Sequence, residues 1–157
     1  MFEKVDPRLD LTLDRVVDLP PELIWKAWTE PKHLVNWFTP PPWKTVDCRI
    51  DLRPGGEFYT EMNGPAGEAF KSAGCYLEIV PSRKLVWTDA LQGGFRPNAN
   101  SMFTAFLYLE PQATGTRYYV IAKHKDEASR KQHEEMGFEQ GWGLVLDQLV
   151  AYMKSLR

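Results

Sequence analysis

Five polar residues in the sequence could carry chemistry: Glu57, Tyr76, Asp89, Arg96 and His124. A carboxylate buried among apolar groups has a raised pKa and can then act as a general base. The sequence contains no recognisable Ser-His-Asp or paired-carboxylate motif. It also has no Gly-rich phosphate loop, because the segment 54–56 is typical of a hairpin turn. The polar residues therefore leave catalysis open as a hypothesis and assign no catalytic residue.

Two histidines, His124 and His133, are close in sequence and have Asp126 and Glu134 nearby. Their spacing of nine does not match the i, i+4 pair of helical zinc sites, and His33 is remote. We therefore expect solvated surface histidines, with no metal and no cofactor.

The two cysteines, Cys48 and Cys75, lie alone in strand-like segments without a CxxC or Cys/His cluster. We interpret them as buried reduced thiols. A disulfide stays open if neighbouring strands bring the two within reach.

Composition narrows the class of protein. The 157 residues fit a single domain over 1–157, and the net charge of −2 gives no basic surface for nucleic acid. No apolar run reaches the roughly 18 residues of a membrane span, and no signal-peptide core is present, so we expect a cytoplasmic protein. Aromatic residues make up 13% of the chain, with six Trp, which suits either a core or the wall of a cavity.

The elements that must position these residues follow from the hydrophobic pattern. Alternation predicts strands over 9–17, 46–52, 58–62, 70–80, 85–88, 101–109 and 116–124, with a flexible loop over 92–100. Two short helical segments, 20–28 and 32–37, are separated by Pro31 and end before three prolines.

The C-terminal segment 126–156 has helical periodicity. Asp126 can cap it, and an apolar stripe runs along it at Trp142, Leu146, Leu149, Met153 and Leu156. One continuous helix of about 30 residues would be about 45 Å long. The order therefore predicts an α+β fold in which an antiparallel meander curves round this helix and the short helices close one end.

Four segments resemble the START-like (SRPBCC) superfamily, in the branch of the activator of heat-shock-protein-90 ATPase homologue. They are 20–31, with an aromatic before Thr-x-Pro, 34–38, the R-x-G-G hairpin in 51–58, and the Gly-Trp segment 136–142. The resemblance implies a helix-grip fold of START/Bet v-like type, with six or seven strands around a long C-terminal helix. That fold hosts lipid and hormone binders, polyketide cyclases and aromatases, and ring-hydroxylase domains.

Candidate cavity residues follow from the resemblance and from strand periodicity. Each could line a cavity or fill a core: Trp37, Phe38, Trp43, Phe58, Met62, Tyr76, Trp87, Phe103, Tyr119, Met136 and Gln140. The helical glycines Gly137, Gly141 and Gly143 either allow close packing on the sheet or hollow out space beside Met136 and Gln140.

Three functional hypotheses result. The first is a protein that binds a hydrophobic or aromatic small molecule in an internal cavity. The second is a cyclase/aromatase-like or hydrolase-like enzyme that uses Asp89, Arg96 and His124 in the same cavity. The third is a chaperone-ATPase-interacting module. A homodimer is also plausible, through an edge strand or a Trp-rich lid.

Overall fold

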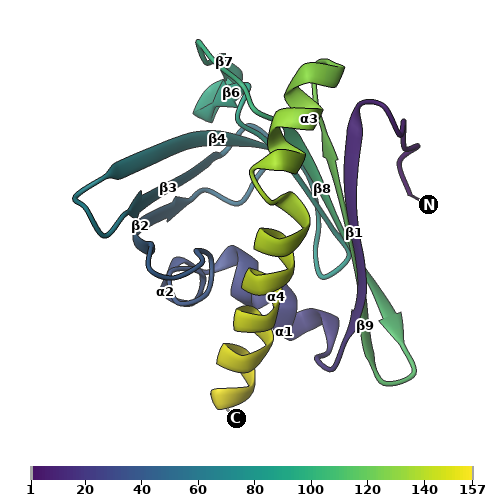
Figure 1. The fold of residues 1–157 in the computed structure, drawn as a ribbon. Coiled ribbons are helices and arrows are strands. Elements are labelled where there is room, and N and C mark those ends of the chain that lie inside the picture. Colours follow the sequence, from purple (N-terminus) through teal and green to yellow (C-terminus); the bar gives the residue numbers. More distant parts are fainter. Residues whose placement is uncertain (1, 157) are drawn as a thin grey trace.

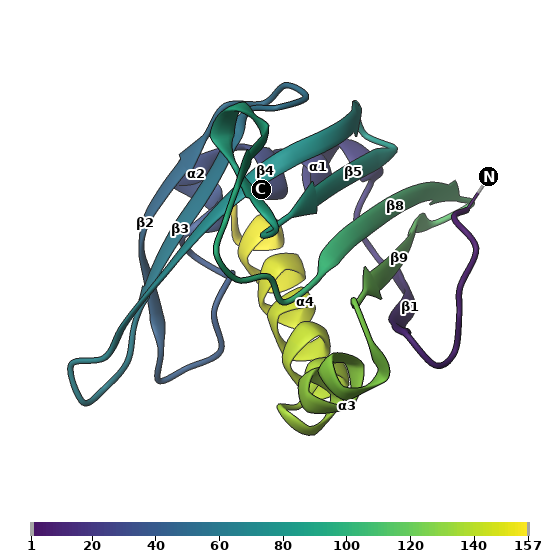
Figure 2. The same ribbon diagram turned by 90° about the horizontal axis from the view of Figure 1, so that it is seen from above.

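A seven-stranded antiparallel sheet wraps round the C-terminal helix α4 (Figures 1 and 2). The computed structural model describes residues 2 to 156. The strand order is β1-β9-β8-β5-β4-β3-β2, so β1 and β2 form the edges. The strands are β1 (Asp10–Val17), β2 (Lys44–Ile50), β3 (Glu57–Asn63), β4 (Ala69–Val80), β5 (Lys84–Thr88), β8 (Thr104–Gln112) and β9 (Gly115–Lys123). This arrangement confirms the predicted α+β helix-grip fold.

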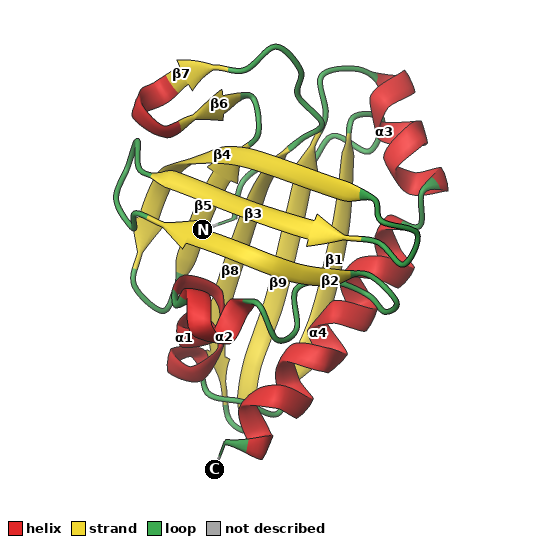
Figure 3. Cartoon of the chain, turned by 90° about the vertical axis from the view of Figure 1, so that its left-hand side faces the viewer, coloured by secondary structure: helices red, strands yellow, loops and turns green. Residues whose placement is uncertain are grey.

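The sheet bends strongly between its two halves. Strands β2, β3 and β4 run across the direction of β8, β9 and β1 (Figure 3). The pairing shifts register between Thr45 and Asp47 in β2 and between Tyr76 and Glu78 in β4. Such irregularities increase the local twist of a sheet, which helps it to curve round a helix.

Two short helices lie against one end of α4 (Figure 1). They are α1 (Pro21–Thr29) and α2 (Pro31–Leu34), and each has a proline in its first turn, where the missing N–H costs no hydrogen bond. Helix α1 buries Ile24, Ala27 and Trp28. Its spacing therefore directs one apolar face into the core.

The C-terminal segment is two helices, α3 (Glu127–Glu135) and α4 (Phe138–Ser155), so the prediction of one continuous helix was wrong. Gly137 separates them with a φ of 90°, a left-handed conformation that glycine adopts without steric cost. The predicted Asp126 cap is confirmed, because its carboxylate accepts a hydrogen bond from the Ser129 N–H at 2.7 Å.

The segment predicted as a flexible loop contains a small two-stranded ribbon. Strands β6 (Leu91–Gln92) and β7 (Arg96–Pro97) flank a 3₁₀ turn over Gly93–Phe95. Asn98 anchors it, since its side-chain amide donates to the carbonyl oxygens of Ala73 at 2.8 Å and Asp89 at 2.9 Å. Over residues 2 to 156, no helix is long and apolar enough to cross a membrane.

Candidate functional site

An apolar hollow of about 410 Å³ lies between the concave face of the sheet and α4. Its walls come from β3, β4 and β5, the segment after α2, the loop before β8 and the corner between α3 and α4. The lining residues are Phe38, Trp43, Phe58, Thr60, Met62, Phe70, Ser72, Gly74, Trp87, Asp89, Met102, Phe103, Met136 and Trp142. Asp89 is the one charged residue among them.

Small residues on two neighbouring strands explain why space remains. Phe58, Thr60 and Met62 alternate along β3, so they share one face. In the paired strand β4, the opposite positions are Gly74, Ser72 and Phe70, respectively. Little side-chain volume enters the interior at three of these positions, which are the facing pair Thr60 and Ser72 and the adjacent Gly74. The hollow therefore lies over a patch of small residues.

Aromatic rings form the rigid part of the wall. Trp87 and Trp142 stack with ring centroids 6.4 Å apart at 20°, and Phe103 meets Trp142 edge-on at 6.1 Å. Phe58 packs edge-on against Trp87 at 5.7 Å. Flat apolar walls with few polar groups are typical of sites for apolar ligands.

An outer pocket of about 540 Å³ adjoins the hollow. The two share Phe70, Ser72, Asp89, Met102 and Met136. Phe70 is 53% exposed and Met136 62% exposed, so the boundary toward solvent is apolar. The rest of the outer pocket is more polar, with residues of the loop 98–101 on one side and Ser129, Gln132 and His133 of α3 on the other.

Asp89 fixes the loop that forms part of both spaces. Its carboxylate accepts hydrogen bonds from the Ser101 hydroxyl and the Met102 N–H, each at 2.9 Å, and from the Phe103 N–H at 3.2 Å. A carboxylate with three such donors is a strong anchor. The structure thus gives Asp89 a positioning role at the boundary of the hollow.

The histidines His124 and His133 are buried and bonded to each other, so the prediction of solvated surface histidines was wrong for both. Nε2 of His124 and Nδ1 of His133 are 2.8 Å apart. Burial, with a smaller contribution from His124, lowers the pKa of His133 to about 4. His133 is therefore neutral near pH 7 and lines the outer pocket.

The structure places eight of the predicted site residues around the hollow: Phe38, Trp43, Phe58, Met62, Trp87, Asp89, Phe103 and Met136. That these residues contact a ligand stays a prediction.

Six predicted residues lie elsewhere. Trp37 is in the packed core, where its indole N–H donates to the Ala27 carbonyl at 3.2 Å. Tyr76 is fully buried and stacks on Phe58. Phe58 lines the hollow, whereas Tyr76 does not. Tyr119 lies on the other face of β9, against Tyr108, because its neighbour Tyr118 takes the inward position.

The remaining three are polar. Gln140 borders a separate groove between α4 and β1, because the turn at Gly137 directs it away from the hollow. Arg96 is exposed on the β6–β7 ribbon. His124 lies behind His133 and does not line either space.

Sequence reasoning missed several lining residues: Thr60, Phe70, Ser72, Gly74, Met102 and the outer-pocket residue His133. Trp142 was assigned to the apolar stripe of the helix and to the Gly-Trp segment, and not to a cavity. The small residues carried a usable signal, because an alternating strand pattern that places Ser and Gly on the buried face indicates unfilled space.

The helical glycines and the two cysteines do not line the hollow. A Cβ at Gly143 would collide with the Arg15 guanidinium, which fits close packing on β1, and a Cβ at Gly141 would meet open space. Both cysteines are free, as predicted, but only Cys75 is buried, so the prediction of a buried thiol was wrong for the partly buried Cys48. Desolvation, with a smaller contribution from Asp47, raises the pKa of Cys48 to about 12. Within residues 2 to 156, no three His, Cys, Asp or Glu side chains gather as a metal site would require.

A curved sheet, a gripped helix and an apolar hollow between them define a helix-grip domain. The sequence model of the family "Activator of Hsp90 ATPase homolog 1-like protein" matches residues 18–154, and the chain belongs to this family.

Solved structures share this fold. Protein NE0264 from Nitrosomonas europaea is 46% identical, with a TM-score of 0.94 over 96% of this chain and 97% of that one. An AHSA1-like protein from Aeromonas hydrophila is 17% identical, with a TM-score of 0.73 over 94% of each chain. A protein from Rhodobacter sphaeroides is 18% identical, with a TM-score of 0.83 over 98% and 99%. The last two show the fold alone. No curated protein sequence matches the chain.

Proposed function

We propose that this chain binds an aromatic or otherwise apolar small molecule in the hollow between the sheet and α4. The observation that carries the proposal is a space of about 410 Å³ with aromatic walls and a single charged lining residue. This volume falls in the range of about 300–1,000 Å³ that is typical of small-molecule sites.

The contacts support a flat ligand. The stacked rings of Trp87 and Trp142 and the edge of Phe103 offer surfaces for offset or edge-to-face packing. The exposed side chains of Phe70 and Met136 lie where the hollow meets the outer pocket, and a long flexible Met adapts to different ligand shapes. Entry through the outer pocket is therefore part of the proposal.

A calorimetric titration with 2-methoxynaphthalene tests this function, because this probe has an aromatic body and no hydrogen-bond donor. We expect saturable binding with a negative heat-capacity change, which marks burial of apolar surface. Ser72→Phe should fill the hollow and weaken binding at least about tenfold, whereas Ser72→Ala should change it little.

Equal binding by the wild type and Ser72→Phe would place the probe outside the hollow and contradict the proposal.

The chaperone-interacting module remains a separate hypothesis. A pull-down with the chaperone at moderate salt tests this hypothesis. If the chain does not capture the chaperone, the hypothesis is wrong.

A further inference from the structure

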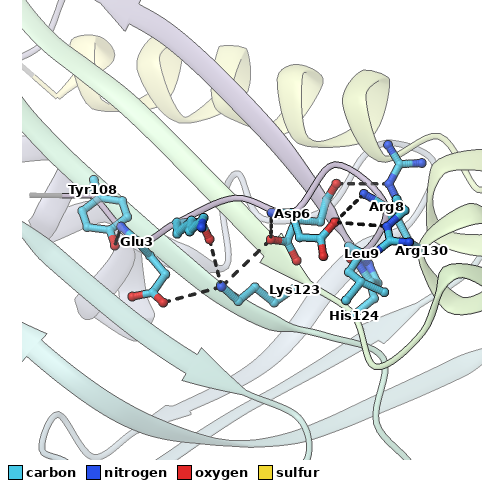
Figure 4. A network of polar contacts seen from close by, with 10 residues as sticks. Glu3, Asp6, Arg8, Leu9, Tyr108, Lys123, His124 and Arg130 are labelled. Atoms are coloured by element: carbon cyan, nitrogen blue, oxygen red, sulfur yellow. Dashed lines mark hydrogen bonds and ion pairs between the residues drawn. The ribbon is translucent and has the colours of Figure 1, made fainter.

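Two bonded histidines at the outer pocket, with His133 in the lining and His124 behind it, have a fixed hydrogen-bond direction. His124 directs Nδ1 at the carbonyl oxygen of Leu9 at 2.9 Å, and its backbone N–H donates to the same oxygen at 3.1 Å. Figure 4 shows His124 beside Leu9, below the N-terminal segment. A carbonyl oxygen only accepts, so Nδ1 of His124 must carry a hydrogen.

The tautomer of the second ring follows from the first. With both rings neutral, Nε2 of His124 has a lone pair and accepts from the Nδ1–H of His133. Nε2 of His133 is then left with a lone pair. The pair therefore ends in a hydrogen-bond acceptor rather than a donor.

This acceptor has no partner among residues 2 to 156. The His133 side chain has one protein hydrogen-bond partner, the His124 ring, which its Nδ1 contacts. Among residues 2 to 156, Tyr76 Oη is the one side-chain nitrogen or oxygen that is both fully buried and without a hydrogen bond. Nε2 of His133 has no hydrogen bond either, so it must be partly accessible to solvent. Because His133 lines the outer pocket, we place the open face of Nε2 there.

Aromatic rings hold His133 next to the hollow. Phe103, which lines the hollow, lies 4.8 Å from the His133 ring, and Phe138 meets that ring edge-on at 5.0 Å. The same burial keeps the pKa of His133 low, at about 4, so the ring stays neutral across the physiological range. A ligand that extends from the hollow into the outer pocket past Phe103 would therefore meet an acceptor at its outer end.

We propose that the His124–His133 pair selects ligands whose aromatic body ends in a hydroxyl group, a phenol or an enol, and that the hydroxyl donates to Nε2 of His133. This inference rests on the proposed function and names the ligand class of the same site. His133 makes the contact, and His124 is a positioning residue that fixes the tautomer of His133.

The test compares 2-naphthol with 2-methoxynaphthalene, which shares the aromatic body and lacks the donor. We expect the wild type to prefer 2-naphthol and His133→Phe to reduce that preference by about three- to tenfold, as expected for one hydrogen bond. His33→Phe is the matched control, since His33 bonds to Tyr152 and lines neither space, and should keep the preference.

The outcomes separate the two proposals. An unchanged preference in His133→Phe, with 2-methoxynaphthalene still bound, overturns the hydroxyl selection and leaves the proposed function standing. Failure of both probes to bind the wild type overturns both.

A second measurement needs no variant. Nitrogen NMR of the wild-type imidazoles should show an unprotonated Nε2 of His133 at pH 7 that shifts with 2-naphthol and not with the ether. A protonated Nε2 in the neutral ring, or no shift with bound 2-naphthol, would overturn the assignment.

Discussion

Trp28 and Trp142 stack at 6.3 Å, yet they belong to two differently built regions of the interior. In the packed region, each residue is at most 1% exposed. This region consists of Trp28, Leu34, Trp37, Tyr118 and Leu146. Its polar groups are bonded, since the Trp28 indole donates to the Tyr118 hydroxyl at 3.0 Å and Trp37 donates to a carbonyl.

The hollow uses the same residue types without filling its space. The indole N–H groups of Trp87 and Trp142 have no hydrogen bond within residues 2 to 156. The small residues Thr60, Ser72 and Gly74 line the same hollow. Aromatic content therefore does not decide between a packed core and a cavity. The size of the facing residues and the bonding of the polar ring edges do.

The largest expected difference is in stability. Trp28→Ala should lower the free energy of unfolding by about 3–5 kcal/mol, because it opens a cavity in a close-packed region. Trp142→Ala should cost about 1–2 kcal/mol, because this ring is only partly buried and already borders empty space. Denaturant unfolding measures both. Equal losses would show that the hollow is packed in solution.

Asp89 tests the frame of the hollow. Asp89→Asn should destabilise the protein by about 2 kcal/mol, because an amide cannot accept from all the donors that the carboxylate now holds. Asp14→Asn is the control, since the Asp14 carboxylate pairs with Arg117 at the surface and should cost less than about 1 kcal/mol. The reverse order would remove the anchoring role of Asp89.

The pH dependence of stability tests the buried state of His133. Its pKa is about 4 in the fold and near the ordinary 6.5 in the unfolded chain, so only the unfolded state takes up a proton between these values. Stability should therefore fall by about 2 kcal/mol as the pH drops from 6.5 to 4, since solvent at one side of the ring moderates the effect.

His133→Phe should flatten that part of the stability profile. A slope that persists unchanged in this variant would assign the titration to another group.

The smallest expected effect has the opposite sign. Tyr76 Oη is buried without a hydrogen-bond partner, so Tyr76→Phe should raise the free energy of unfolding by about 1 kcal/mol. Tyr118→Phe removes an acceptor of the Trp28 indole and should lower it by about 1–2 kcal/mol. Destabilisation by both substitutions would mean that Tyr76 Oη has a partner in solution.

Sequence periodicity predicted most of the fold because strand alternation and the apolar stripe of α4 are local patterns. It placed Tyr119 on the wrong face because Tyr118 and Tyr119 are equally suited to burial and only the packing of Trp28 against Tyr118 decides. The helix break at Gly137 was missed because a glycine inside a helix and one between helices differ only in φ.

The candidate site was less predictable. The bond between His124 and His133 depends on how α3 folds back over the end of β9, which no spacing rule contains. The hollow depends on the register that places Thr60 opposite Ser72.

The most direct test of the hollow is a crystal structure of the wild type under xenon pressure. Xenon enters dry apolar cavities without regard to ligand chemistry. We predict xenon density bounded by Phe58, Trp87 and Trp142, and none beside Trp37 in the packed region. A hollow without xenon, closed by these rings, would contradict the account.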